Sequence, residues 1–313
     1  MKNTVVGRFA PTPSGRMHAG NVFAALMAWL GVRSAGGRMV LRIEDLDPRA
    51  HNPEATHLLL DDLQWLGLDW DEGPYCQSER GDIYGSALRE LEDKGLLYPC
   101  FCTRAELHAA AAPHASDGTY LYAGTCRGLS PAEVARRSAV RPPALRLRVP
   151  VETDPAGVID FNDLVYGRQH EVLAHEVGDF IVRRSDGVYA YQLAVVVDDA
   201  LMGVNQVVRG HDLLGSSARQ IYLQRLLGYE QPAYAHVPLL VAPDGRRLSK
   251  RDRDLDLGEI RAHDAGPGRL LGRLAATVGL AEPGEDVSAP ALVERFSWDR
   301  VRASAQENVV FEA

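Results

Sequence analysis

The chain has 313 residues, of which 46% are hydrophobic and 24% charged, so it can bury the cores of roughly two or three domains. No apolar stretch approaches the roughly 20 residues that span a bilayer, and no hydrophobic signal-peptide core precedes Pro11, so we expect a cytoplasmic protein with no membrane partner. The net charge of −8 excludes a surface with general affinity for nucleic acid. A local basic face is compatible with this net charge.

The first part of the chain alternates predicted strands with predicted helices. We expect strands over 4–9 and 38–47, and helices over about 22–32, 53–66 and 79–94. This alternation predicts an α/β fold with a doubly wound parallel sheet, whose ligands lie beyond the C-terminal ends of the strands. Both Arg8 and Glu44 stand at such ends.

After residue 97 the sequence pattern changes to Ala-rich segments, Pro-rich segments and short segments of alternating hydrophobicity. This change predicts an inserted, smaller α+β subdomain. Strand-helix alternation then resumes, with a helix over about 216–227, and completes the parallel sheet. The last stretch looks mainly helical. We therefore expect a Rossmann-type domain in two halves, over 1–97 and 187–252, with the insert over 98–186 between them. A helical C-terminal region follows over 253–313.

Three of the four cysteines are close in the sequence, at Cys100, Cys102 and Cys126. Cys-x-Cys with a third cysteine returning later is typical of a tetrahedral zinc site, which needs a fourth ligand. Chemistry alone nominates His108 or His114 from the intervening loop. Three buried cysteines without a metal are the alternative, and Cys76 stands apart with an expected structural role.

Two short motifs indicate a phosphate-binding site. His18, Gly20 and Asn21 stand between a strand and a helix, where unpaired N–H groups and the helix dipole favour phosphate. The segment RLSKR carries Ser249 and Lys250 after an Asp-Gly turn and is suited to closing over a triphosphate. Taken singly, the motifs also fit a helix-capping turn and a solvated charge run.

Together the motifs resemble the HIGH and KMSKS signatures of class I aminoacyl-tRNA synthetases, here written HAGN and RLSKR, with Asn21 in place of the second histidine. GRFAPTPSG, LRIEDLD and AYQLAVVVDDALMGVNQVVRGHDLLGSSARQIYL are similar to the glutamyl branch of that class, and the likeness extends over 7–251. Within the branch, the short chain with its cysteine insertion resembles the glutamyl-Q tRNA(Asp) synthetases, which lack an anticodon-binding domain. The resemblance implies ATP-dependent activation of L-glutamate and its transfer to queuosine in the tRNA(Asp) anticodon stem-loop.

The resemblance also implies a glutamate site. Recognition of a carboxylate calls for arginine, whose planar fork can make two charge-assisted hydrogen bonds, and the candidates are Arg8 and Arg209. Glu44 would pair with the substrate ammonium, and Tyr191 would donate its hydroxyl. By family position the whole set is Arg8, Phe9, Ala10, Pro11, Thr12, Glu44, Tyr191 and Arg209.

The implied chemistry needs no protein nucleophile, because the α-carboxylate of glutamate attacks the α-phosphorus of ATP and an acceptor hydroxyl then attacks the mixed anhydride. His18 and Lys250 would act as catalytic residues that stabilise charge on the phosphates. Mg²⁺ is expected with ATP, held largely by phosphate and water. The expected ATP contacts are His18, Gly20, Asn21, Ser249 and Lys250.

The family pattern places a tyrosine four residues before the last cysteine of the zinc site. In this chain it is Tyr122, which makes the expected structural zinc ligands Cys100, Cys102, Tyr122 and Cys126. His108 is the fallback, and Tyr120 is also available because the loop is long.

Three other functions compete with this interpretation. A truncated glutamyl-tRNA synthetase would charge tRNA(Glu), but only about 60 residues follow Lys250, too few for a large anticodon-binding region. A noncatalytic paralogue that binds RNA or senses an amino acid would not need to keep His18 and Lys250. A different nucleotidyltransferase would leave Arg8 and Arg209 without a role. A monomer is the default expectation.

Overall fold

A computed structural model of the chain describes residues 4–48, 52–103, 106, 121–246 and 256–311. Its first parallel sheet has the order β1-β2-β3, with strands at Val6–Phe9, Arg38–Ile43 and Glu72–Cys76. In the second sheet, of order β7-β6-β10-β9, only β7 is antiparallel to its neighbour. Its strands are β6 (Val158–Asp163), β7 (Gly167–Val172), β9 (Gln206–Gly210) and β10 (Ala233–Val237).

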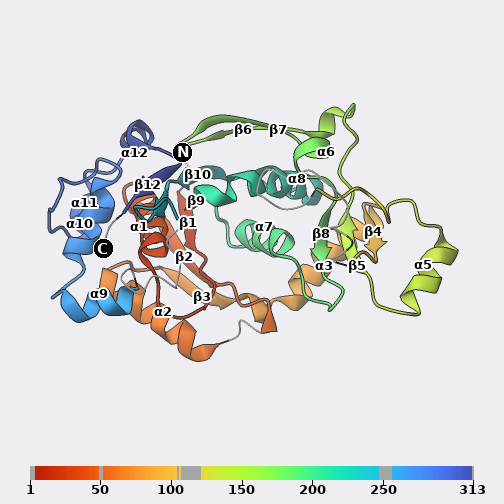
Figure 1. Cartoon of the computed structure of the whole chain (residues 1–313), viewed down its shortest axis with the longest axis horizontal. Coiled ribbons are helices and arrows are strands. Elements are labelled where there is room, and N and C mark those ends of the chain that lie inside the picture. Colours follow the sequence, from red (N-terminus) through yellow and green to blue (C-terminus); the bar gives the residue numbers. More distant parts are fainter. Residues whose placement is uncertain (1–3, 49–51, 104–105, 107–120, 247–255, 312–313) are drawn as a thin grey trace.

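The two sheets meet where β1 lies beside β9. The backbone N–H of Asn205 donates to the Val6 carbonyl over 3.0 Å, and the Asn205 side chain accepts from the Val6 N–H over 2.8 Å. The same side chain donates to the Thr4 carbonyl over 2.9 Å. The joined sheets therefore run in the order β3-β2-β1-β9-β10-β6-β7, with the β6–β7 hairpin along the upper edge of the view in Figure 1.

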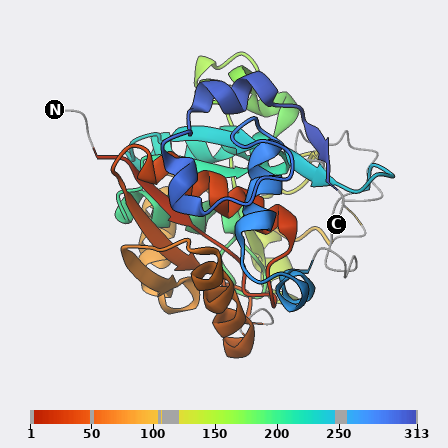
Figure 2. The ribbon, with the colours of Figure 1, turned by 90° about the vertical axis from the view of Figure 1, so that its left-hand side faces the viewer.

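Helices cover both faces of the joined sheets. Side chains alternate along a strand, and in β2 Met39 and Leu41 enter one hydrophobic core while Val40 enters the other. The first core lies under α1, α2 and the C-terminal helices, which Figure 2 shows in front of α1. The second core lies under α3, α7 and α8. This arrangement confirms the predicted α/β fold. The five helices are α1 (Ala19–Arg33), α2 (Pro53–Leu66), α3 (Gly81–Asp93), α7 (Tyr191–Leu201) and α8 (Ser217–Leu227).

The bounds of α2 match the prediction because local signals set both ends. The Asn52 side chain caps the helix by accepting from the Ala55 N–H over 3.1 Å, and Pro53 occupies the first turn. Gly67 ends the helix with a left-handed φ of 72°. α1 begins at Ala19, directly after His18, and the helix carries the apolar stretch from Val22 to Val32 that was expected in it.

The segment that was expected to be an insert contributes to two sheets. An antiparallel sheet of order β4-β5-β8 lies with α5 (Pro131–Ser138) at the end of the molecule opposite α10 (Gly268–Ala276; Figure 1). The β6–β7 hairpin instead joins the second parallel sheet, where Asp163 pairs with Tyr234 of β10. The remaining elements of the segment are β4 (Leu97–Cys100), β5 (Ala144–Leu147), β8 (Phe180–Arg183) and α6 (Leu173–Glu176).

The C-terminal region is mainly helical, as predicted, and ends in a strand that the sequence did not indicate. This strand, β12 (Asn308–Val310), is parallel to β11 (Leu239–Val241). Within the described ranges, no helix has both the length and the apolar character that crossing a membrane requires. The helices of this region are α9 (Leu257–His263), α10 (Gly268–Ala276), α11 (Ala289–Val293) and α12 (Trp298–Ser304).

We predict that Gly7→Ala destabilises the fold, because a Cβ at this position of β1 would lie 2.4 Å from Val32 Cγ2 of α1. Packing an extra methyl group into a closed core costs about 1–3 kcal/mol, and we expect the free energy of unfolding to fall by that amount in urea titrations followed by circular dichroism. Gly81→Ala is the matched control, because a Cβ there meets no atom within 4 Å. Equal stability of the two variants would contradict the prediction, and adding Val32→Ala to Gly7→Ala should restore part of the loss.

Candidate active site

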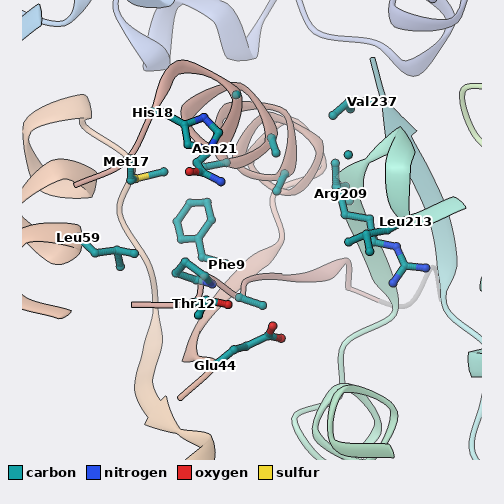
Figure 3. A pocket seen from close by; sticks show the side chains of 18 of the residues that line it. Phe9, Thr12, Met17, His18, Asn21, Glu44, Leu59, Arg209, Leu213 and Val237 are labelled. Atoms are coloured by element: carbon teal, nitrogen blue, oxygen red, sulfur yellow. The ribbon is translucent and has the colours of Figure 1, made fainter. Parts of the chain in front are cut away.

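A cavity of about 670 Å³ lies where the C-terminal ends of β1, β2 and β9 face the start of α1. Figure 3 shows His18 and Asn21 at one end, Glu44 beside Thr12 at the other, and Arg209 on the facing strand. Ser249 and Lys250 lie outside the described residues. The cavity brings together the other predicted glutamate and ATP residues, namely Arg8, Phe9, Ala10, Pro11, Thr12, His18, Gly20, Asn21, Glu44, Tyr191 and Arg209.

The HAGN motif forms the first turn of α1. His18 is the extended N-cap residue, and its ring lies so close to the helix that a Cβ on Gly20 would be 3.1 Å from the imidazole Cε1. Glycine at position 20 therefore lets the His18 ring rest against the helix backbone. The first N–H groups of a helix lack intrahelical partners, and Gly20 and Asn21 of this turn line the cavity, an arrangement suited to phosphate oxygens.

Buried Asp62 of α2 fixes the turn before α1. Its carboxylate accepts from the Met17 N–H over 2.9 Å and from Arg261 of α9 over 3.0 Å. The Leu257 N–H at the start of α9 donates to the Met17 carbonyl over 2.9 Å. α9 is the first described helix after the RLSK segment. Its contacts with Asp62 and Met17 therefore connect the chain that follows this segment to the turn before His18.

Glu44 extends from the end of β2 into a charged cluster. Fully buried Arg42 donates to Glu44 over 3.2 Å and to Asp199 over 2.7 Å. Burial raises the pKa of Glu44 above its ordinary value, and the attraction of Arg42 and Arg8 offsets only part of the increase. A cation in the cavity would favour the charged form of Glu44, so this carboxyl group is suited to bind an ammonium.

Arg209 is a buried cation held by uncharged groups. Only 5% of the residue is exposed, and no described carboxylate lies within 4.0 Å of its guanidinium. By contrast, Arg8 Nε lies 3.6 Å from Asp199. The three acceptors on Arg209 are His236 Nε2 at 3.0 Å, Gln220 Oε1 at 2.8 Å and Ser217 Oγ at 3.0 Å. None of these acceptors was predicted from the sequence.

Tyr191 begins α7 and lines the same cavity. Burial raises the pKa of the Tyr191 phenol, and the charge of Glu44 adds to the increase. The hydroxyl therefore stays protonated and can donate a hydrogen bond to a ligand.

The cysteine cluster lies far from this cavity, in the β4-β5-β8 region. The Sγ atoms of Cys102 and Cys126 are 3.6 Å apart, and Tyr122 Oη lies 3.5 Å from the Sγ atoms of both Cys100 and Cys102. Tetrahedral zinc with Zn–S bonds of about 2.3 Å places ligand atoms about 3.8 Å apart, so these four donors fit the ion. The competing ligands His108, His114 and Tyr120 lie outside the described residues, and Cys76 is in β3.

Arg146 is a partner of this cluster that the sequence did not indicate. Its Nε donates to Cys100 Sγ over 3.2 Å, and its guanidinium carbon lies 3.8 Å from the centre of the Tyr122 ring. Burial disfavours the Cys100 thiolate, but the hydrogen bond with Tyr122 and the charge of Arg146 bring the pKa of the thiol below its ordinary value. Cys100 is therefore the thiol most disposed to present negatively charged sulfur, whereas burial and the charge of Cys100 raise the pKa of Cys102 to about 11.

Comparison with known proteins gives a consistent family. Residues 4–286 match the model of the catalytic domain of class I tRNA synthetases for E and Q. The glutamyl-Q tRNA(Asp) synthetase of Symbiobacterium thermophilum is 50% identical over 307 residues, which cover 94% of this chain and 93% of that protein. The protein of the same name from Nitratidesulfovibrio vulgaris is 47% identical over 88% of this chain and 86% of its own length.

Solved structures agree with the sequence comparisons. A glutamate tRNA ligase from Elizabethkingia meningosepticum, crystallised with its amino acid, has a TM-score of 0.82 at 26% identity and matches 99% of this chain over 68% of its own. The glutamate-tRNA synthetase of Elizabethkingia anophelis gives a TM-score of 0.83 at 27% identity with the same coverage. The chain belongs to the glutamyl-Q tRNA(Asp) synthetase family, within the class I glutamyl and glutaminyl tRNA synthetases.

Proposed function

We propose that this protein activates L-glutamate with ATP and transfers the glutamyl group to queuosine in the anticodon stem-loop of tRNA(Asp). The observation that carries the proposal is a cavity with the buried Arg209 cation on one wall and the Glu44 carboxylate on another, in a chain half identical to a relative of that name. Glutamate has two carboxylates and one ammonium, and the charges of the cavity complement them. ATP and tRNA are cytoplasmic substrates, so we place the reaction there.

In this proposal Glu44 binds the ammonium of glutamate, while Arg209 and Arg8 are available to its carboxylates. Tyr191 donates its hydroxyl to the bound amino acid. Glutamine is rejected because its neutral amide leaves the charge of a buried arginine without a counter-charge. Aspartate is rejected for a weaker reason, because it reaches the same groups less well.

Activation then follows from placement of the two substrates. The α-carboxylate of glutamate forms a bond to the α-phosphorus of ATP, the bond to the pyrophosphate oxygen breaks, and pyrophosphate leaves. Mg²⁺ bound with ATP would neutralise part of the phosphate charge. His18 and the start of α1, with Gly20 and Asn21, stabilise the phosphate charge, and Ser249 and Lys250 complete the site. A hydroxyl of the queuosine cyclopentenediol next attacks the glutamyl carbonyl carbon and releases AMP.

The cysteine cluster is proposed to hold a structural zinc ion. Cys100, Cys102, Tyr122 and Cys126 supply four converging donors, and Arg146 balances part of their negative charge. Zinc ligation would clamp the loop that follows β4 onto the chain around Cys126. The ion takes no part in the chemistry at the distant cavity.

The decisive experiment is transfer of radiolabelled glutamate, with ATP and Mg²⁺, to matched tRNAs. We expect labelling of tRNA(Asp) that contains queuosine, and none of tRNA(Asp) with guanosine at that position or of tRNA(Glu). Labelling of tRNA(Glu) alone would mean a translational synthetase. Activation of glutamate without transfer to any of the three would reduce the function to amino-acid activation.

We predict that Glu44→Gln raises the KM for glutamate about tenfold or more in pyrophosphate exchange, because the substrate ammonium loses its charged partner. In the wild type, binding is strong above the pKa of Glu44 and is lost as pH falls through it. Since this pKa is raised, the loss should begin at a higher pH than for an ordinary glutamate. Exposed Glu90→Gln is the control, and a wild-type KM and pH profile in Glu44→Gln would refute the assignment.

We also predict that purified protein contains about one zinc ion per chain by mass spectrometry of metals, and that Cys126→Ser removes it. Tyr122→Phe keeps the ring under Arg146 but deletes the oxygen, so reduced zinc affinity in this variant would identify the fourth ligand. Cys76→Ser is the matched control and should keep the metal. A metal-free wild type, with no change in melting temperature on chelation, would exclude the site.

A further inference from the structure

Arg209 and His236 are opposite residues of two parallel strands, β9 and β10. His236 is fully buried, and its Nε2 lies 3.0 Å from Arg209 Nε. Because an arginine N–H only donates, His236 Nε2 has to be the acceptor and carries no proton. The ring is therefore neutral, with its remaining proton on Nδ1.

Asp163, at the end of β6, fixes this tautomer. Its carboxylate lies 2.7 Å from His236 Nδ1 and accepts from the backbone N–H groups of His236, Val165 and Tyr166 over 3.1, 2.9 and 3.0 Å. Burial raises the pKa of Asp163, but the hydrogen bond with His236 and these backbone bonds bring it below its ordinary value. A fully buried, ionised carboxylate thus orients the His236 ring.

The environment also keeps His236 neutral. Burial lowers the pKa of His236 to about 4, and the nearby Arg209 charge acts in the same direction while Asp163 opposes it. A proton on Nε2 would place two donors against each other in a site closed to water. His236 can therefore accept from Arg209 without adding a negative charge to it.

The acceptors leave part of the Arg209 guanidinium available. A guanidinium carries five N–H groups, one on Nε and two on each terminal nitrogen. His236, Gln220 and Ser217 take one N–H from each of the three nitrogens, so each terminal nitrogen keeps one. All three acceptors are uncharged, so among the described residues nothing within ion-pair distance neutralises the cation that faces the cavity.

We propose that His236, oriented by Asp163, is a positioning residue for substrate recognition, which holds the Arg209 guanidinium against the cavity while leaving its charge for a substrate carboxylate. The inference rests on the proposed function, because it concerns the glutamate site. A carboxylate in place of His236 would make the same hydrogen bond but would neutralise Arg209. A hydrocarbon side chain in place of His236 would leave the Arg209 Nε–H without an acceptor, and the guanidinium would be free to rotate.

Two amide variants separate the two hydrogen bonds of His236. In His236→Asn the side-chain amide lies near the place of Nδ1, so it can donate to Asp163 but is too short to reach Arg209. In His236→Gln the amide oxygen extends to the place of Nε2, so it can accept from Arg209 while the bond to Asp163 is lost. If the role of His236 were purely structural, both variants would lose stability, and neither would show a selective change in the KM for glutamate.

For a positioning role, the KM for glutamate in pyrophosphate exchange should rise about tenfold or more in His236→Asn and stay within about threefold of the wild type in His236→Gln. The KM for ATP should stay unchanged in both. Calorimetric titration of glutamate without ATP gives the same comparison independently of activation, and thermal unfolding verifies that each variant is folded.

An unchanged glutamate affinity in His236→Asn would overturn the inference, as would equal losses for glutamate and ATP in both variants. The outcomes also separate it from the proposed function. A wild type that binds glutamate but transfers none to RNA would refute the function, while the difference between the Asn and Gln variants in calorimetry would still support His236 as the positioning residue.

Discussion

The hydrogen bonds that join Asn205 to Val6 bring two parallel sheets into one surface, and the cavity depends on this junction. Arg8 comes from the first sheet and Arg209 from the second. Across the junction, Arg8 Nη1 donates to the Val208 carbonyl over 3.0 Å, which fixes the two strands at the level of the site. A slip of one strand would move an arginine to the opposite face, because side chains alternate along a strand.

A second junction lies at the other end of the cavity. Asp62 binds both the Met17 N–H in the turn before α1 and Arg261 of α9, which lies 199 positions further along the chain than Asp62 itself. Arg16 pairs with the same carboxylate, and loss of both arginines would leave Asp62 as an unpaired charge in the core, which is more costly than losing a surface ion pair. Contacts within the fold therefore hold the start of α1.

Much of this architecture could be predicted from local signals, and the rest depends on register. Asn52, Pro53 and Gly67 determine the bounds of α2, and strand ends place Arg8 and Glu44 at the edge of the sheet. The support behind Arg209 could not be predicted, because His236 is in a short apolar segment and meets Arg209 only through the pairing of β9 with β10. The same is true of β12, which pairs with β11 from the far end of the chain.

The buried arginines Arg42 and Arg209 differ in whether a neighbouring carboxylate neutralises their charge. Arg42 is neutralised by Asp199 and Glu44, so it offers little charge to a ligand. Arg209 has all three nitrogens hydrogen-bonded to neutral groups, so its desolvation is partly offset while its field persists in the cavity. Binding an anion recovers the rest of that cost, and a neutral analogue does not. In the proposed function, selectivity for a carboxylate therefore results from the absence of charge on the groups that hold the arginine.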